Sequence, residues 1–142
     1  MKGNLWEQVS VITSEWVQDN DSGVVWAGEF ENRLGIRIEQ ECRDATTIWF
    51  DPGTITLHFE AYLFGRVSNH ELARRFLRFN TGSWPVLVAF DSGEDIFLSG
   101  RLPVQVIDEE TLGIIVAGIH TGVERLFPHC IAAIKAGRET SR

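Results

Sequence analysis

Hydrophobic residues recur at helical spacing in three parts of the chain. A repeat of about three to four residues places each set on one face of a helix, and such a face is normally buried. The three sets are Leu5, Val9, Ile12 and Trp16 near the N-terminus; Leu72, Phe76 and Phe79 in the middle; and Leu112, Ile115, Val116, Ile119, Val123, Leu126 and Phe127 after residue 108. We therefore expect three amphipathic helices that pack against a common core.

Residues that begin and end these helices are also visible in the sequence. Asn4 and Ser68 are expected N-caps, because a glutamate three residues after each can complete a capping box. Asp108 is expected to cap the third helix, since Asp is a strong N-cap and two glutamates follow it in the first turn. We expect Pro128 to interrupt the third helix, or to start a second helical piece over 129–135, because proline lacks the N–H that a helix interior needs.

Alternation of apolar and polar residues predicts β-strands between the first two helices and before the third. The expected strands span 24–30, 36–42, 45–50 and 54–64, followed after the second helix by a hairpin of 84–90 and 95–102. The hairpin is expected to turn at 91–94, which reads Asp-Ser-Gly-Glu. The pattern predicts an α+β fold: a single antiparallel sheet of about five to six strands with helices packed on one face, in the order α-β-β-β(-β)-α-β-β-α.

Size and composition fit a single domain over residues 1–142, with a frayed tail at 136–142. Five Trp and nine Phe can build a core without disulfides. Cys42 and Cys130 are far apart, so we expect reduced thiols and a cytoplasmic protein. The first ten residues contain no apolar run, so we expect no signal peptide.

The formal net charge of the chain is −7. A nucleic-acid partner is not expected, because binding a phosphate backbone needs a basic surface. A membrane span is not expected either, because no run approaches the roughly 20 apolar residues that a span requires. The charge is instead compatible with basic or amphipathic protein partners.

Candidate chemistry is sparse. The chain has no P-loop, no GxGxxG after a strand and no GxSxG, so we expect no catalytic residue, no metal and no cofactor. His58 and Glu60 share a strand face, and His129 lies beside Cys130; these residues leave open a metal-assisted enzyme as one alternative. A regulatory domain that binds a small molecule between helix and sheet is the other alternative. The basic flank of Arg74, Arg75 and Arg78 fits either a solvated helix face or an acidic or phosphate-bearing partner.

Several aromatic residues do not fit the predicted core. Trp49, Tyr62 and Phe64 have the parity opposite to the core positions of their strands, and Trp84 and Phe97 lie in the predicted hairpin. An exposed aromatic patch made of Trp49, Tyr62, Phe64, Trp84 and Phe97 would be a protein-binding surface, because such patches mark interfaces. The alternative is that a helix covers these residues or that they are scattered.

The segments HELARRFLRFN (70–80), PVLVAFDSGEDIFLSGRLPV (85–104) and DEETLGIIVAGIHTGVERLFP (108–128) resemble the YbjN family. That family has the fold of the class I type III secretion chaperones, and the element order agrees over nearly the whole chain. The resemblance implies a small, acidic, cytoplasmic protein that binds other proteins or regulates sensory and stress responses. Secretion chaperones dimerise and wrap an effector segment over apolar patches. The resemblance therefore implies a homodimer and a protein or peptide partner, and it identifies no catalytic residue.

Overall fold

The computed structural model describes residues 3–140, with side chains described through residue 138. A helix comes first, four strands follow, and a second helix, two strands and a long third helix complete the order. The elements are α1 (Asn4–Gln18), β1 (Val24–Phe30), β2 (Arg33–Glu39), β3 (Ala45–Pro52), β4 (Thr56–Phe64), α2 (His70–Asn80), β5 (Leu87–Phe90), β6 (Ile96–Pro103), a 3-10 turn (Val104–Val106) and α3 (Glu109–Thr140).

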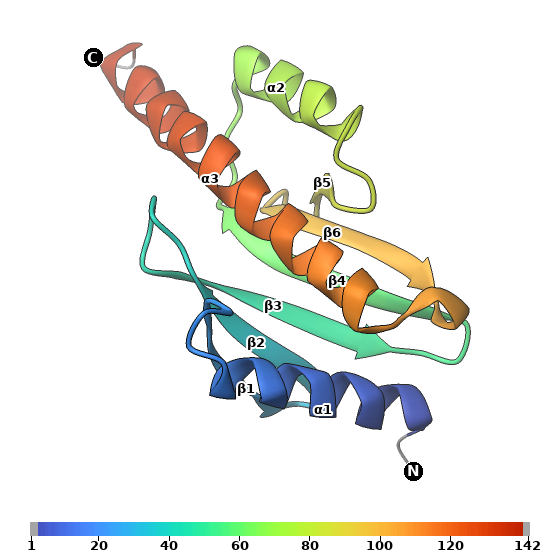
Figure 1. The fold of residues 1–142 in the computed structure, drawn as a ribbon. Helices are drawn as coiled ribbons and strands as arrows, with labels where there is room; N and C mark the ends of the chain where they lie inside the picture. Colours follow the sequence, from blue (N-terminus) through green and yellow to red (C-terminus); the bar gives the residue numbers. More distant parts are fainter. Residues whose placement is uncertain (1–2, 141–142) are drawn as a thin grey trace.

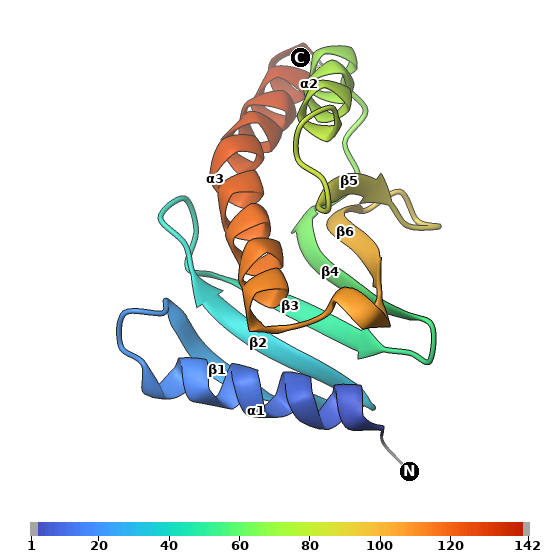
Figure 2. The same ribbon diagram turned by 45° about the vertical axis from the view of Figure 1, so that its right-hand side comes forward.

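The strands form one six-stranded sheet in the order β1-β2-β3-β4-β6-β5, and every neighbouring pair is antiparallel. Helices α1 and α3 lie across the same face of this sheet, and α2 stands beside the C-terminal half of α3 (Figures 1 and 2). The predicted α+β fold with helices on one face is confirmed. The opposite face of the sheet is left uncovered by any described helix.

Alternation along β4 shows how the sequence builds these two faces. Leu57, Phe59, Ala61 and Leu63 are fully buried beneath the helices, as their parity predicts. They meet the apolar positions of α3, of which Leu112, Ile115, Ile119 and Val123 are fully buried. Burial of apolar surface between sheet and helices is the main source of stability for a chain of this size.

The helix starts differ from prediction at two of the three sites. Asn69, not Ser68, caps α2: its backbone is extended and its side-chain oxygen accepts from the Leu72 N–H at 2.9 Å. Asn and Ser are about equally good caps, so the pattern could not distinguish neighbouring positions. Asn4 is the first residue of α1, after Gly3 in the N-cap position with no side-chain cap. Asp108 caps α3 as predicted, accepting from the Thr111 N–H at 2.8 Å.

Pro128 does not interrupt the third helix, and this prediction was wrong. Helix α3 runs without a break from Glu109 to Thr140, with Pro128 inside it. Proline removes one backbone hydrogen bond, but Leu126 and Cys130 on either side of it are buried and hold both halves in place. The tail that we expected to fray from residue 136 is helical through Thr140, and residues 141–142 lie outside the described residues.

The first strand of the predicted hairpin begins later than expected. We placed its start at Trp84, whereas β5 begins at Leu87. Residues 83–86 form a turn instead, in which the Val86 N–H donates to the Ser83 carbonyl at 3.0 Å and the Ser83 hydroxyl donates to the Val86 carbonyl at 2.6 Å. Trp84 therefore lies in the loop between α2 and β5.

Candidate functional site

The uncovered side of the sheet, which we call the open face, carries the best candidate for a functional surface. Its residues lie in rows that cross the strands, because paired residues in an antiparallel sheet stand opposite each other. The central row is Gly28, Gly35, Trp49, Glu60, Ser99 and Leu87. The flanking rows contain Trp26, Arg37, Thr47, Tyr62, Phe97 and Ala89 on one side, and Phe30, Arg33, Asp51, His58 and Arg101 on the other.

Three aromatic rings gather at the β1–β3 end of the open face. The Trp26 and Trp49 rings meet edge to face with centroids 6.5 Å apart, and the Phe30 ring lies 6.2 Å from that of Trp49. We call Trp26, Phe30 and Trp49 the aromatic platform. It is half-buried at the two tryptophans and exposed at Phe30.

Two glycines on adjacent strands make room for this platform. A Cβ atom added to Gly35 would lie 2.6 Å from Cζ3 of Trp49 and 3.1 Å from Cζ3 of Trp26. A Cβ atom added to Gly28 would lie 2.6 Å from Cζ2 of Trp26. The glycines therefore let both rings approach the strand backbone closely, which is the use of glycine within a strand where another group comes near.

A band of charged side chains crosses the sheet beside the platform. The Arg33 guanidinium donates to both carboxylate oxygens of Asp51 at 2.8 Å and to Oε1 of Glu60 at 2.8 Å. The Nδ1 atom of His58 lies 3.1 Å from the Asp51 carboxylate. Arg33 also sits 5.4 Å from the centre of the Trp49 ring, so the band and the platform are joined by a cation–π contact.

The electrostatics of this band favour a structural brace over acid–base chemistry. Hydrogen bonding to Asp51, above all, raises the pKa of Arg33. Partial burial alone would raise the pKa of Asp51, but hydrogen bonds from Arg33 and His58 outweigh it and lower that pKa. A general acid working near neutral pH needs a carboxyl group whose pKa is raised. Asp51 is shifted in the opposite direction.

A shallow depression of about 510 Å³ lies between the aromatic platform and the Tyr62–Phe97 pair. The Tyr62 and Phe97 rings meet edge to face at 5.7 Å. Arg43 closes one side, where its guanidinium donates to the carbonyls of Tyr62 at 2.7 Å and Leu63 at 2.8 Å. Burial lowers the pKa of Arg43. The depression thus combines aromatic walls with a fixed polar rim.

Of the five aromatic residues predicted from sequence, Trp49, Tyr62 and Phe97 come together on the open face. Tyr62 is 48% exposed there. Phe64 does not join them, because a register shift between Tyr62 and Phe64 turns its ring towards α3, where it contacts Phe127 at 5.8 Å. Trp84 is 74% exposed but lies in the loop before β5, apart from the others.

The sequence reasoning missed Trp26, Phe30 and Arg33. A register shift between Val24 and Trp26 explains the first: Val24 is buried beneath the helices, whereas Trp26 lies on the open face. Strict alternation along the predicted strand 24–30 would put both residues on one side. The available signal was Gly28, which leaves space on a strand for a large neighbouring ring.

The donors of the metal-enzyme alternative are not brought together. His58 and Glu60 lie on the open face, whereas His129 lines a cleft between α2 and α3. No group of three or more His, Cys, Asp or Glu side chains among the described residues could hold a metal ion. Other cavities include the α2–α3 cleft, of about 600 Å³, and a groove of about 590 Å³ between α1, β2 and α3.

Comparison with known proteins gives a likeness at the level of fold. The chain matches no family model and no curated protein. A solved structure that it resembles is the chaperone SpcU, in the heterodimeric complex ExoU–SpcU from the type III secretion system of Pseudomonas aeruginosa. The two share 15% sequence identity at a TM-score of 0.57, over 84% of this chain and 95% of that one. Within the described part of the chain, no helix is long and apolar enough to span a bilayer. The structural match to SpcU, together with the order of helices and strands, shows that the chain has a fold like that of a type III secretion chaperone.

Proposed function

We propose that this chain is a non-catalytic, chaperone-like protein-binding domain that buries a segment of a partner protein on its open face. The observation that carries the proposal is the aromatic surface there, formed by the platform and by Tyr62 and Phe97. Aromatic anchors surrounded by polar groups are typical of protein interfaces. The likeness to SpcU, whose complex contains a second protein, ExoU, supports the same conclusion.

The chemistry of the open face defines what the segment should contain. The depression between Trp49 and the Tyr62–Phe97 pair can accept an apolar or aromatic side chain. Glu60 and Asp51 are already engaged by Arg33, so they hold the surface in shape. With a net charge of −7, the chain as a whole favours a partner segment that also carries basic residues.

The test is capture of partners from native lysate with three forms of the protein. Wild type is compared with Trp49→Ser/Phe97→Ser, which removes two anchors, and with Ile114→Ser as the matched control. Ile114 is 51% exposed, close to the exposure of Tyr62, but it lies on α3. Loss of an anchor should cost about 2 kcal/mol, roughly a thirtyfold loss of affinity. The proposal fails if the double variant retains every partner or if the control loses the same ones.

We also propose that two copies associate through α2 and β5. Leu77, Trp84 and Phe90 are exposed on α2, the following loop and β5, which lie side by side. Asn80 occupies the outer edge of β5 through hydrogen bonds to the N–H and carbonyl of Val88 at 2.8 and 3.2 Å. Because that backbone edge is blocked, the contact would use side chains. Light scattering should report a dimer for wild type and a monomer for Leu77→Ser/Phe90→Ser.

Residues 1–142 are proposed to act as one cytoplasmic domain related to the YbjN family. The support is the sequence resemblance over 70–128 and the presence of two reduced cysteines. In this setting the domain would regulate sensory or stress responses by binding another protein. Deletion of the gene, followed by complementation with the Trp49→Ser/Phe97→Ser form, tests whether any resulting phenotype depends on the open face.

One observation still favours the alternative that this domain binds a small molecule. The groove between α1, β2 and α3 has an apolar floor that includes Trp16, Ile38 and Val116, and acidic residues line its rim. Such a groove is of the size that small ligands occupy. A ligand that binds only the folded state raises the melting temperature, so a thermal-shift screen of cationic amphipathic metabolites tests it. If the groove binds a ligand, some compound should raise the melting temperature of wild type but not that of Val116→Trp, in which the groove is filled. If no compound does so, the alternative is excluded.

A further inference from the structure

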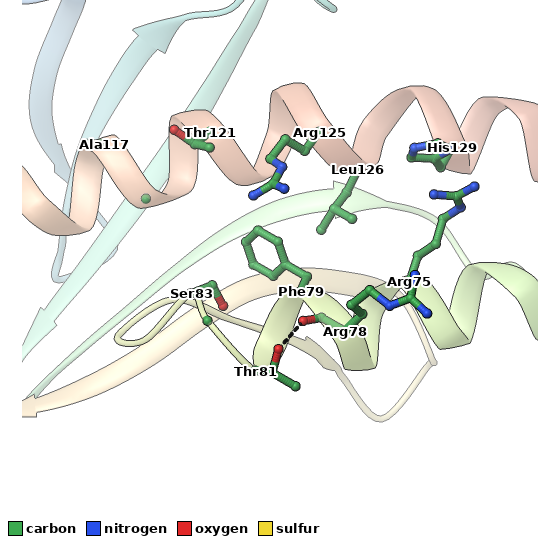
Figure 3. Close-up of a pocket in the computed structure, with 12 residues that line it drawn as sticks. Arg75, Arg78, Phe79, Thr81, Ser83, Ala117, Thr121, Arg125, Leu126 and His129 are labelled. Atoms are coloured by element: carbon green, nitrogen blue, oxygen red, sulfur yellow. Dashed lines mark hydrogen bonds between the residues drawn. The ribbon is translucent and has the colours of Figure 1, made fainter.

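The cleft between α2 and α3 concentrates positive charge in an acidic protein. Arg75 and Arg78 approach from α2, and Arg125 and His129 approach from α3 (Figure 3). Figure 3 shows Arg75 extending towards His129, and Arg125 extending from α3 towards Phe79. Among the described residues that line the cleft, none is acidic. The chain as a whole carries a net charge of −7, so this cluster of three arginines has the opposite sign to the net charge of the protein.

No described side chain of the protein neutralises the three arginines of the cleft. Among the described side chains, residues 3–138, Arg75, Arg78 and Arg125 form no ion pair. Glu71 lies one turn before Arg75 on α2 and lines an adjoining hollow together with Arg75 and His129. Glu71 nevertheless forms no salt bridge with Arg75. Like charges that line one cleft repel each other, and an anion bound in that cleft would reduce the repulsion.

Helix electrostatics explain only part of the cluster. Arg78 lies in the last turn of α2, where a cation is favoured by the helix dipole. Arg125 and His129 lie well inside α3, which ends only at Thr140, so the dipole gives no reason for their placement. Their common feature is that they face the same cleft as Arg75 and Arg78.

We propose that the α2–α3 cleft binds an anion that carries more than one phosphate group. The fork geometry of arginine matches phosphate oxygens in pairs, and three guanidiniums supply more charge than a single phosphate can balance. The cleft, at about 600 Å³, has room for a phosphate chain with an organic group attached. The apolar side chains of Phe79 and Leu126 line it beside the arginines and would contact such a group. This site is separate from the open face and independent of the proposed function.

The experiment is calorimetric titration of the full chain with inorganic tripolyphosphate at low salt. Orthophosphate and sulfate at equal ionic strength test for charge number, and a nucleoside triphosphate tests for an organic group. The proposal predicts one saturable site per chain for tripolyphosphate and much weaker binding of orthophosphate and sulfate. Equal binding of the nucleoside triphosphate identifies the phosphate chain as the recognised group, and tighter binding identifies a nucleotide; both support a polyphosphate site.

The variants Arg75→Gln and Arg125→Gln test the location, with Arg74→Gln as the matched control. Arg74 lies on α2 but does not line the cleft. Each cleft variant should weaken tripolyphosphate binding roughly tenfold, because hydrogen bonds to charged groups are worth about 1.5 kcal/mol or more. The control should bind as wild type does. Absence of binding by folded wild type, an equal loss in Arg74→Gln, or equally tight binding of polyglutamate would overturn the proposal.

Discussion

Substitution of Gly35 by alanine tests the geometry of the aromatic platform. The added Cβ would lie 2.6 Å from the Trp49 ring, which is closer than Cβ atoms come to other atoms in real structures, so that ring must move. It would also lie 3.1 Å from the Trp26 ring, an unusually tight contact that requires a smaller adjustment. Trp49 is held by its contacts with Trp26 and Phe30 and by the Arg33 guanidinium above its ring. Displacement of Trp49 would weaken all of these contacts at once.

The expected change in the free energy of unfolding is the energy of the aromatic and cation–π contacts that are lost, less the backbone entropy that alanine recovers. An aromatic pair is worth about 0.5–1.5 kcal/mol and an exposed cation–π contact about 0.5–1 kcal/mol. Alanine in a strand recovers about 0.5–1 kcal/mol of backbone entropy relative to glycine. The net expectation is a loss of about 1 kcal/mol in the free energy of unfolding, or a melting temperature lower by about 3 °C. Without the rings above Gly35, the same substitution should instead stabilise the protein.

The assay is urea unfolding combined with near-ultraviolet circular dichroism, which reports the packing of the tryptophans. Gly113→Ala is the matched control, because a Cβ there meets no atom within 4 Å and Gly113 lies in helix α3. That variant should be more stable than wild type by about 0.5–1 kcal/mol, with an unchanged tryptophan signal. If Gly35→Ala is also stabilised and its tryptophan signal is unaltered, the placement of the platform over β2 is wrong.

Three further predictions concern the core and its titratable groups. Gly100→Ala should lower the free energy of unfolding by about 3 kcal/mol, because its Cβ would clash with the Pro85 carbonyl and lie 2.5 Å from the Phe59 ring; urea denaturation measures this. Burial would raise the pKa of Glu124, but hydrogen bonds from the β2–β3 turn outweigh it and lower that pKa below the usual 4.5. Glu124→Gln should therefore lower the free energy of unfolding by about 1 kcal/mol at neutral pH. Because the wild-type carboxylate becomes protonated as the pH falls below 4.5, urea denaturation should show this difference shrinking there. Burial raises the pKa of Cys130 to about 11, so iodoacetamide should label it at neutral pH only after unfolding; native labelling would contradict its placement.

The layers of the fold could be predicted from the sequence because their signals are regular. The parity of β4 was correct from Leu57 to Leu63, and the spacing of buried apolar residues on α3 was correct from Leu112 to Leu126. The turn at 91–94 was also located, and there the Glu94 backbone takes a positive φ of 66°. Periodic burial over many residues averages out local exceptions, so these elements were predictable.

The open face was less predictable because two irregularities rearrange it. A bulge adds one residue to a strand and reverses the side on which the following residues lie. One register shift in β1 puts Trp26 on the open face, and another in β4 turns Phe64 away from it. The unpaired residues at the two shifts, Val25 and Leu63, are apolar residues with no turn-forming tendency, so strict alternation was wrong at both positions.

The contacts that connect distant segments were invisible for a different reason. Arg33 joins Asp51 and Glu60 across three strands, and the pairing of side chains on neighbouring strands depends on register. Alternation in the sequence shows which residues of one strand share a side, whereas the register between neighbouring strands is fixed only in the folded sheet. Arg75 and Arg125 illustrate the same point between helices, since 50 residues separate them in the sequence.

Photo-crosslinking tests the central claim, that the open face holds a partner segment, most directly. A photoreactive phenylalanine analogue replaces Phe97 on the open face or, as the control, Ile114 on the outer side of α3. The account predicts that illumination in living cells links position 97 to one defined segment of another protein and leaves position 114 without that product. Cross-linking of the same segment from position 114, or the absence of any protein adduct at position 97, would contradict it.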